Sequence, residues 1–216
     1  MDSRSALKLV FTGLLTQYAG AGRVFDSYWK EIVDAYSAPG RHYHNLDHLH
    51  YICKTLKGSP GRASNEEAVH FALFYHDLVY EIPNVSNEEQ SAEIAARRMK
   101  GLGVDQASSD LCIKHILATK DHKNSDNADT NLFCDADMAV LGDSPEVYKA
   151  YCKKLRAEFS SVSPEEYARG RISELEKMLD MEPLFKTLYF RQKFEVDARR
   201  NMLHEVGELS ETISSK

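Results

Sequence analysis

The chain has 216 residues, of which 43% are hydrophobic and 28% are charged, as in an ordered globular protein. Its 27 basic and 33 acidic side chains give a net charge of −6, which argues against a broad nucleic-acid-binding surface. No apolar run approaches the ~20 residues that span a bilayer. The four cysteines form no C-x-x-C pair and fit buried thiols in a reducing compartment. We therefore expect a cytoplasmic protein with neither a membrane nor a nucleic-acid partner.

Apolar residues spaced three and four apart predict amphipathic helices throughout the first half of the chain. The breaks between them fall at glycine, proline and polar capping residues. These helices are predicted over residues 7–18, 24–36, 45–58, 68–80, 87–101 and 105–120. The fourth follows the capping-box sequence Ser64-x-x-Glu67 and is apolar almost all round, which indicates a buried central helix.

Two Ser-Pro-Glu sequences mark helix starts in the second half of the chain, at residues 144–146 and 163–165. A polar loop is predicted over 121–130, and a final helix over about 194–209. Only 132–134 is ambiguous between helix and strand. Because neither a repeat nor a linker interrupts the pattern, we expect one all-α domain over residues 1–216, with the helices of 144–210 packed on its core.

The nine histidines are unevenly distributed, because eight of them lie between His42 and His122. One of these, His76, stands next to Asp77 inside the apolar run of the fourth helix. Burying an imidazole and a carboxylate costs several kcal/mol unless they are paired or bound to a cation. A metal site and a hydrogen-bonded pair between helices are both open interpretations.

The third helix favours the metal site. His44 and His48 are four residues apart and share one helix face, so His48 suits a ligand and His44 a proton-transfer group one turn away. Asp135 and Asp137, in another apolar segment, offer a distant carboxylate ligand. Two imidazoles and two carboxylates without a thiolate suit a divalent ion such as Mn, Fe, Co, Ni, Zn or Mg.

The order His48, His76-Asp77, Ala136-Asp137 resembles the signature of the HD-domain superfamily of metal-dependent phosphohydrolases. Tyr43-His44-Asn45-x-x-His48 also looks like the start of the catalytic domain of cyclic nucleotide phosphodiesterases. Five strings within residues 41–142 together resemble a family of small, stand-alone predicted HD phosphohydrolases. They are Arg41-x-Tyr43-His44-Asn45, His76-Asp77-x-x-Tyr80, Asn87-Glu88-x-x-Ser91-Ala92, Thr119-Lys120-x-His122 and Asp135-Ala136-Asp137-x-x-x-Leu141-Gly142.

The resemblance implies a helical bundle of the HD type and a role for each matching residue. Four residues become the metal ligands, and Asp137 is preferred to Asp135 because the family's last ligand tends to follow alanine. The ligands are His48, His76, Asp77 and Asp137. His44 becomes the general acid. Glu88 orients or deprotonates water, unless it is only a first-turn acid favoured by the helix dipole. Lys120 is also expected to be catalytic, by offsetting phosphate charge. The expected substrate contacts are Arg41, Tyr80, Lys120 and His122. An ordinary ion pair is open for Arg41, and a second metal or plain surface solvation is open for Lys120 and His122.

The implied activity is hydrolysis of a phosphate ester or anhydride in a small, nucleotide-like metabolite. Two alternatives stay open. One is a di-iron oxygenase of the same fold, in which His115 and His122 add ligands. The other is a nucleotide-binding module without turnover. The sequence also leaves open whether the chain forms a homo-oligomer.

Overall fold

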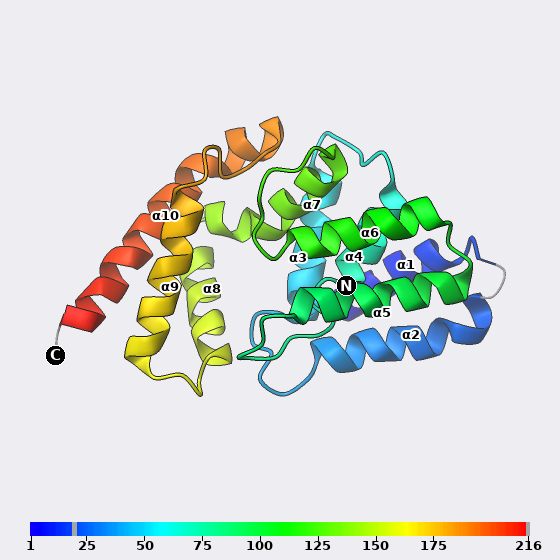
Figure 1. Cartoon of the computed structure of the whole chain (residues 1–216), viewed down its shortest axis with the longest axis horizontal. Helices are drawn as coiled ribbons and strands as arrows, with labels where there is room; N and C mark the ends of the chain where they lie inside the picture. The colour runs from blue at the N-terminus through cyan, green and yellow to red at the C-terminus, as the bar shows by residue number, and fades with distance from the viewer. Residues whose placement is uncertain (19–20, 215–216) are drawn as a thin grey trace. The chain divides into compact units, whose positions relative to one another are not determined.

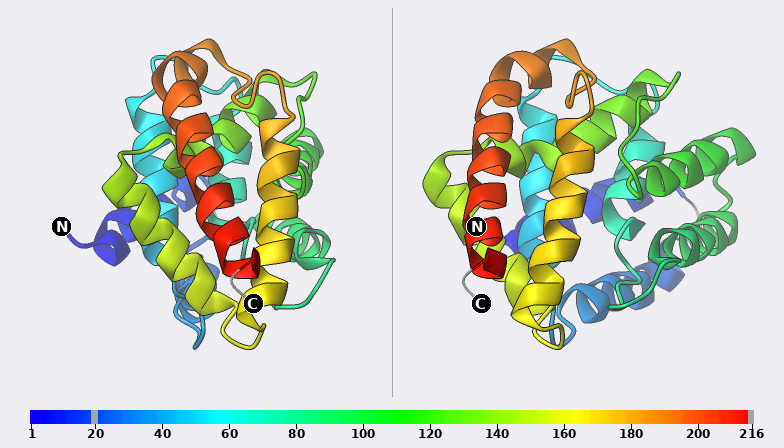
Figure 2. Two further views of the ribbon diagram at one scale, coloured as in Figure 1. Left: turned by 90° about the vertical axis from the view of Figure 1, so that its left-hand side faces the viewer. Right: turned by 60° about the vertical axis from the view of Figure 1, so that its left-hand side comes forward.

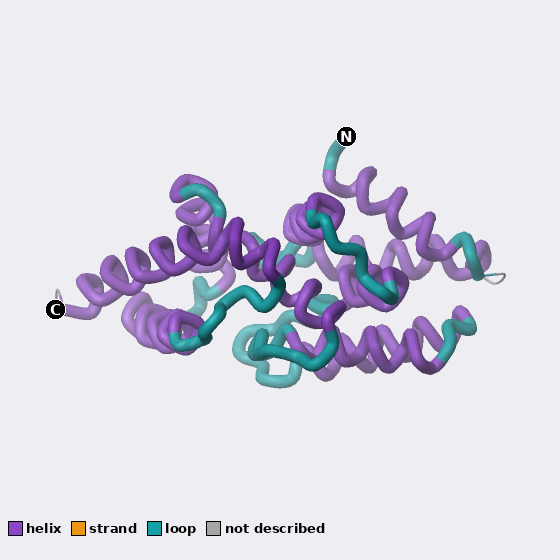
Figure 3. Tube along the Cα trace, turned by 90° about the horizontal axis from the view of Figure 1, so that it is seen from above, coloured by secondary structure: helices purple, strands orange, loops and turns teal. Residues whose placement is uncertain are grey.

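The computed structural model describes residues 1–18 and 21–214, which form ten α-helices, one 3₁₀ helix and no strand (Figure 3). The all-α prediction is confirmed for these residues, and the HD type of bundle stays a prediction. None of the described helices is both long enough and apolar enough to cross a bilayer.

The chain divides into two compact units, Met1–Cys134 and Asp135–Lys216. The boundary falls inside a continuous helix, α7, so no linker separates the units. The expectation of one domain stays a prediction. The helices of the first unit and the helix at the boundary are α1 (Ser3–Leu15), α2 (Ala21–Tyr36), α3 (Leu46–Gly58), α4 (Glu66–Tyr75), α5 (Asn87–Leu102), α6 (Gln106–Ala118) and α7 (Ala128–Met138) (Figure 1).

Helix α4 is the centre of the first unit and contacts α1, α3, α5 and α6. Seven of its ten residues are buried, as the apolar run predicts. Its cap is Asn65 rather than Ser64, because the Asn65 side chain accepts the backbone N–H of Ala68 at 2.9 Å. The backbone N–H groups of Ser64 and Asn65 are in turn bound by the Asp129 carboxylate, at 2.8 Å each.

Helix α4 ends at Tyr75, five residues before the predicted end at Tyr80. Beyond it, backbone N–H groups leave the helix for tertiary acceptors. The N–H of Asp77 donates to the Tyr36 hydroxyl at 3.2 Å, and that of Val79 donates to the Ser91 hydroxyl at 3.0 Å. His76 and Asp77 therefore lie at the helix end and in the turn after it, where side chains reach directions that a helix interior does not allow.

Helix α7 begins inside the predicted polar loop and includes the ambiguous segment 132–134. The Asn127 side chain accepts the N–H of Thr130 at 2.9 Å and so starts the helix. Thr130 also bonds the buried imidazole of His115 at 2.9 Å. The Asn127 cap is local, whereas His115 lies on α6, so only the second contact depends on another element.

The second unit contains the rest of α7, the 3₁₀ helix η1 (Ala139–Gly142), α8 (Pro145–Glu158), α9 (Pro164–Leu179) and α10 (Leu188–Ser214). Helix α10 lies alongside α9 (Figure 2). It also crosses η1 at Gly142, where a Cβ atom would lie 2.5 Å from the Phe194 carbonyl oxygen. Both Ser-Pro-Glu starts are confirmed, and α9 carries a full capping box at Ser163 and Glu166. Helix α10 is longer at both ends than the predicted 194–209.

Candidate metal centre

His48 lies in the first turn of α3, which Asn45 caps by accepting the N–H of Asp47 at 2.9 Å. Its side chain is buried. His76 is the C-cap residue of α4 and is 1% exposed. The Nδ1 atom of His76 lies 3.2 Å from the Leu73 carbonyl oxygen, which can only accept a hydrogen bond. Nδ1 is therefore the protonated nitrogen, and Nε2 carries the lone pair that a metal needs.

Three ligand atoms of the first unit form a triangle. The Nε2 atoms of His48 and His76 lie 3.4 Å apart. The Oδ2 atom of Asp77 lies 3.1 Å from His76 Nε2 and 3.7 Å from His48 Nε2. Ligand atoms about 2.1 Å from one ion lie about 3.0 Å apart in an octahedron and about 3.4 Å apart in a tetrahedron. The two distances that involve His76 lie within this range, and the distance of 3.7 Å between His48 and Asp77 is about 0.3 Å longer, so the triangle is close to the size that one divalent ion requires.

Asp77 is ionised in this environment. Burial raises the pKa of its carboxyl group, but the neighbouring imidazoles, that of His76 above all, hold the pKa well below its usual range. An ionised carboxylate between two buried imidazoles is the form that binds a cation.

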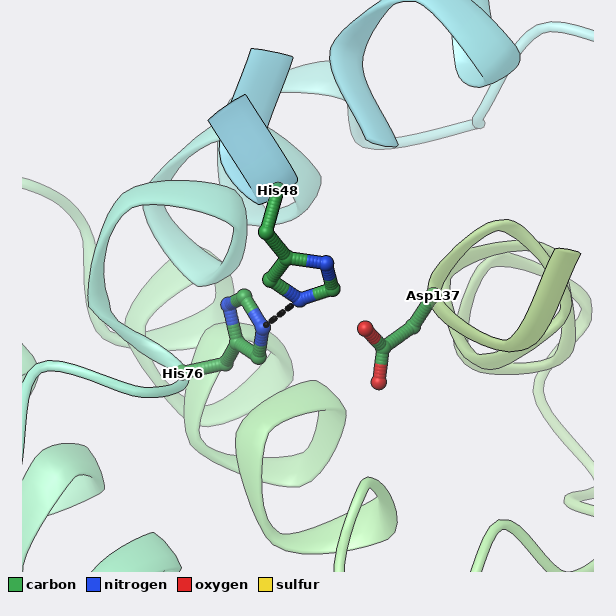
Figure 4. A group of neighbouring side chains, drawn as sticks. All are labelled: His48, His76 and Asp137. Atoms are coloured by element: carbon green, nitrogen blue, oxygen red, sulfur yellow. Dashed lines mark hydrogen bonds between the residues drawn. The ribbon is translucent and has the colours of Figure 1, made fainter. Parts of the chain in front are cut away.

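Asp137 is the third member of a group in which the ligand atoms of His48, His76 and Asp137 all lie within 4.8 Å of one another. Figure 4 shows the two imidazoles and this carboxylate pointing toward a common point. Asp137 lies in the last turn of α7, whose first seven residues belong to the same unit as the two histidines. This group of two imidazoles and one carboxylate could hold a divalent ion of borderline or hard character.

Asp135 has a different role, although it precedes Asp137 by only two residues. It is fully buried, and its carboxylate accepts the N–H groups of Lys186 and Thr187 at 2.9 and 2.7 Å and the Thr187 hydroxyl at 2.7 Å. These bonds hold the segment that leads into α10. Residues two apart on a helix point about 200° apart, so the two carboxylates face different directions.

His44 lies beside this group. Its ring centroid is 5.5 Å from that of His48, 4.9 Å from that of Tyr43 and 4.3 Å from that of Tyr80. His44 lies in the loop before α3 and not on the helix face predicted for it, but its half-buried imidazole contacts that of His48 and is placed to exchange a proton with a molecule bound at the ion.

Arg41, predicted as a substrate contact, is held by backbone carbonyl groups. Its Nη1 donates to the carbonyl oxygens of His44 at 3.1 Å and Asp77 at 2.6 Å, and its Nη2 donates to that of Leu78 at 2.9 Å. Its guanidinium also lies 5.3 Å from the ring centroid of Tyr80. Substrate contact by Arg41 and Tyr80 stays a prediction.

The remaining predicted residues lie at the start of α5 and after α6. Lys120 Nζ donates to the Val85 carbonyl oxygen at 2.7 Å and to Glu89 Oε1 at 2.5 Å, and Glu88 precedes Glu89 in the first turn of α5. His122 is half-buried, with a left-handed backbone φ of 51°. The catalytic roles of Glu88 and Lys120 and the substrate contacts of Lys120 and His122 stay predictions.

His115 is separated from the candidate ligands by an aromatic ring. Phe133 packs against His115, with centroids 6.3 Å apart, and edge-on against His76, with centroids 5.6 Å apart. Sequence reasoning did not find Phe133, Leu73 or Tyr36, which orient His76 and Asp77, because apolar and aromatic residues in helices carry no signal of such a role.

No protein-family model, curated protein or solved structure matches this chain. The geometry of the site therefore carries the functional argument.

Proposed function

We propose that this protein is a metal-dependent phosphohydrolase that acts on a small phosphorylated metabolite of nucleotide type. The observation that carries the proposal is the triangle of His48 Nε2, His76 Nε2 and Asp77 Oδ2, with the imidazole of His44 beside it. A half-buried carboxylate against two buried imidazoles is costly without a cation, and a proton donor next to a metal site is what ester hydrolysis needs.

His48, His76, Asp77 and Asp137 would hold the ion, and the contact of His76 Nδ1 with Leu73 keeps Nε2 free of a proton. When bound, such an ion supplies Lewis-acid activation of water and of a phosphoryl oxygen. His44 would give its proton to the departing oxygen, which removes the cost of expelling an alkoxide. Phe133 covers the buried side of the His76 ring and limits access of water there.

The di-iron alternative needs additional ligands from His115 and His122. In the structure, His115 is fully buried, its Nδ1 bonds Thr130 and its ring packs on Phe133. This arrangement favours the hydrolase over the oxygenase. Metal stoichiometry with oxygen uptake separates the two, because the oxygenase requires two irons per chain and consumption of oxygen.

The proposal is tested on the purified full chain, stripped of metal and reloaded with Mn, Fe, Co, Ni, Zn or Mg in turn. Each form is assayed against a panel of nucleotides and simple phosphoesters. We expect hydrolysis only with metal, and loss of metal binding and of turnover in Asp77→Asn. Asp34→Asn, which removes an exposed carboxylate paired with Lys30, is the matched control. Hydrolysis that survives chelation, or full activity of Asp77→Asn, would contradict the proposal.

Tight nucleotide binding without turnover of any panel compound would instead favour the non-catalytic binding module. Metal titration by calorimetry is independent of turnover, so it still tests the ligand set in that case.

A further inference from the structure

We propose that Arg41 is a positioning residue, which fixes the His44 proton donor relative to the Asp77 ligand, and that it is not a phosphate contact. The inference rests on the proposed function, since it assigns Arg41 to the proton-transfer step of that site. It is carried by the three hydrogen bonds of one guanidinium group.

Those bonds join two segments that are far apart in the sequence. The carbonyl of His44 belongs to the loop before α3, whereas the carbonyls of Asp77 and Leu78 belong to the turn after α4. A single nitrogen, Nη1, donates to both His44 and Asp77. The backbone at the proton donor and the backbone at the metal ligand are thus held by the same atom.

The turn after α4 needs such a donor. The carbonyl groups of Asp77 and Leu78 lie just past the end of α4, outside the helix, and close to the negative end of the helix dipole. A guanidinium group offers five N–H donors in a planar fork and keeps its positive charge, so it meets several carbonyls at once. A lysine ammonium group has the same charge, but it lacks the planar arrangement of several N–H donors.

Two aromatic rings complete the arrangement. The Arg41 guanidinium lies 5.0 Å from the ring centroid of Tyr36, whose hydroxyl accepts the N–H of Asp77. It lies 5.3 Å from the ring centroid of Tyr80, which contacts the imidazole of His44. Arg41 therefore acts on His44 through the backbone and through Tyr80, and on Asp77 through the backbone and through Tyr36.

The consequence is a fixed separation between proton donor and ion. A displacement of about 1 Å in a catalytic group costs up to about 100-fold in rate. Within the loop that carries His44, Asn45 donates its backbone N–H to Tyr43 at 2.8 Å and its side-chain amide to His42 at 3.0 Å. Removing the guanidinium would break the hydrogen-bonded link from this loop to the turn after α4.

The test compares Arg41→Ala and Arg41→Lys with Arg97→Ala, which removes an exposed arginine on α5 and serves as the control. The first measurement is the histidine-ring ¹⁵N spectrum of the metal-free protein, with the His44 signal assigned by its loss in His44→Gln. The second is the affinity of the Mn-loaded protein for inorganic phosphate. The third is kcat and KM for the best panel substrate.

We expect Arg41→Ala to shift the His44 ring signals while those of the distant His204 stay in place, and millimolar guanidinium to restore them. Arg41→Lys should not restore them. Phosphate affinity should stay within about twofold, and kcat should fall about 10- to 100-fold with little change in KM. Arg97→Ala should behave as the wild type in all three measurements.

Unchanged His44 signals in Arg41→Ala would overturn the inference. So would a tenfold loss of phosphate affinity without a change at His44, because that result identifies a phosphate contact. If Arg41→Ala does not fold, Arg41→Lys decides by the same criteria. If no panel compound is hydrolysed, the proposed function fails, but the ring spectrum and the guanidinium rescue still decide the positioning role.

Discussion

At the scale of single residues, the two carboxylates of the Asp135-Ala136-Asp137 sequence have separate roles. Asp135 accepts three hydrogen bonds from Lys186 and Thr187, and Asp137 joins the candidate ligand group. The same substitution should therefore change a different property at each position: metal affinity at Asp137 and stability at Asp135.

Asp137→Asn should weaken metal affinity by at least about 10-fold with little change in stability, because a charged ligand is lost. Asp135→Asn should leave metal affinity nearly unchanged and reduce the free energy of unfolding by about 1–3 kcal/mol, because an amide cannot accept all three bonds. Calorimetric metal titration and urea denaturation measure the two effects. Loss of metal binding in Asp135→Asn alone would reverse the assignment.

His44 is predicted to act in proton transfer and not in metal binding. His44→Gln should keep metal affinity within about twofold, since none of the three triangle distances involves His44. It should lower kcat by about 10²–10⁴-fold, the range for loss of a general acid. Steady-state kinetics with metal titration measures both. A variant that fails to bind metal would make His44 a ligand instead.

At the scale of elements, the contact between α6 and α7 contains a buried titratable group. The pKa of His115 is lowered to about 4, mainly by burial. The charge of Asp129 opposes this shift, and the charge of Lys114 adds to it. The unfolded chain binds a proton at His115 near pH 6.5, and the folded chain does so only near pH 4. The contribution of His115 to the free energy of unfolding is therefore constant above about pH 6.5 and is lost as the pH falls toward 4.

This difference amounts to about 3 kcal/mol between pH 7 and pH 4. His115→Asn keeps a polar atom for Thr130 and cannot titrate. Its free energy of unfolding should fall less on acidification than that of the wild type, by about this amount. Urea denaturation at a series of pH values measures the comparison, and parallel curves for the two proteins would show that His115 does not carry the effect.

At the scale of the whole molecule, each unit has its own core. In the second unit, Arg171 is buried and donates to both carboxylate oxygens of Glu205, at 3.0 and 3.2 Å, and to the Tyr151 hydroxyl at 3.1 Å. The Tyr148 hydroxyl also donates to Glu205. This network joins α8, α9 and α10. Loss of Glu205 would leave the buried guanidinium with one remaining carboxylate partner, the exposed Glu174 at 3.1 Å.

Glu205→Ala should therefore reduce the free energy of unfolding by about 3–5 kcal/mol. Glu208→Ala, which removes an exposed carboxylate on the same helix, should cost under about 1 kcal/mol. Circular dichroism follows all the helices during urea denaturation. Fluorescence of the single Trp29 follows the first unit. Because α7 belongs to both units, we expect the urea midpoints measured by circular dichroism and by fluorescence to decrease together in Glu205→Ala. A shift in circular dichroism alone would show that the units unfold separately.

Much of the helix pattern was predictable from the sequence, because caps and helix breaks depend on residues close in the chain. Asn45, Ser86 and Asp105 start helices where the pattern predicts them, and Gly103, with φ of 80°, closes α5. The same applies to the candidate ligands, since an imidazole or carboxylate in an apolar run signals its own cost of burial.

The tertiary structure alone decided the features that depend on distant partners. Helix α4 ends at Tyr75 because Tyr36 and Ser91 take the next backbone N–H groups. The start of α7 is tied to α6 because the imidazole of His115 bonds Thr130. The sequence determined which groups are available for metal and proton chemistry. The fold decided which atoms converge, since hydrogen bonds between segments dozens of residues apart leave no pattern along the chain.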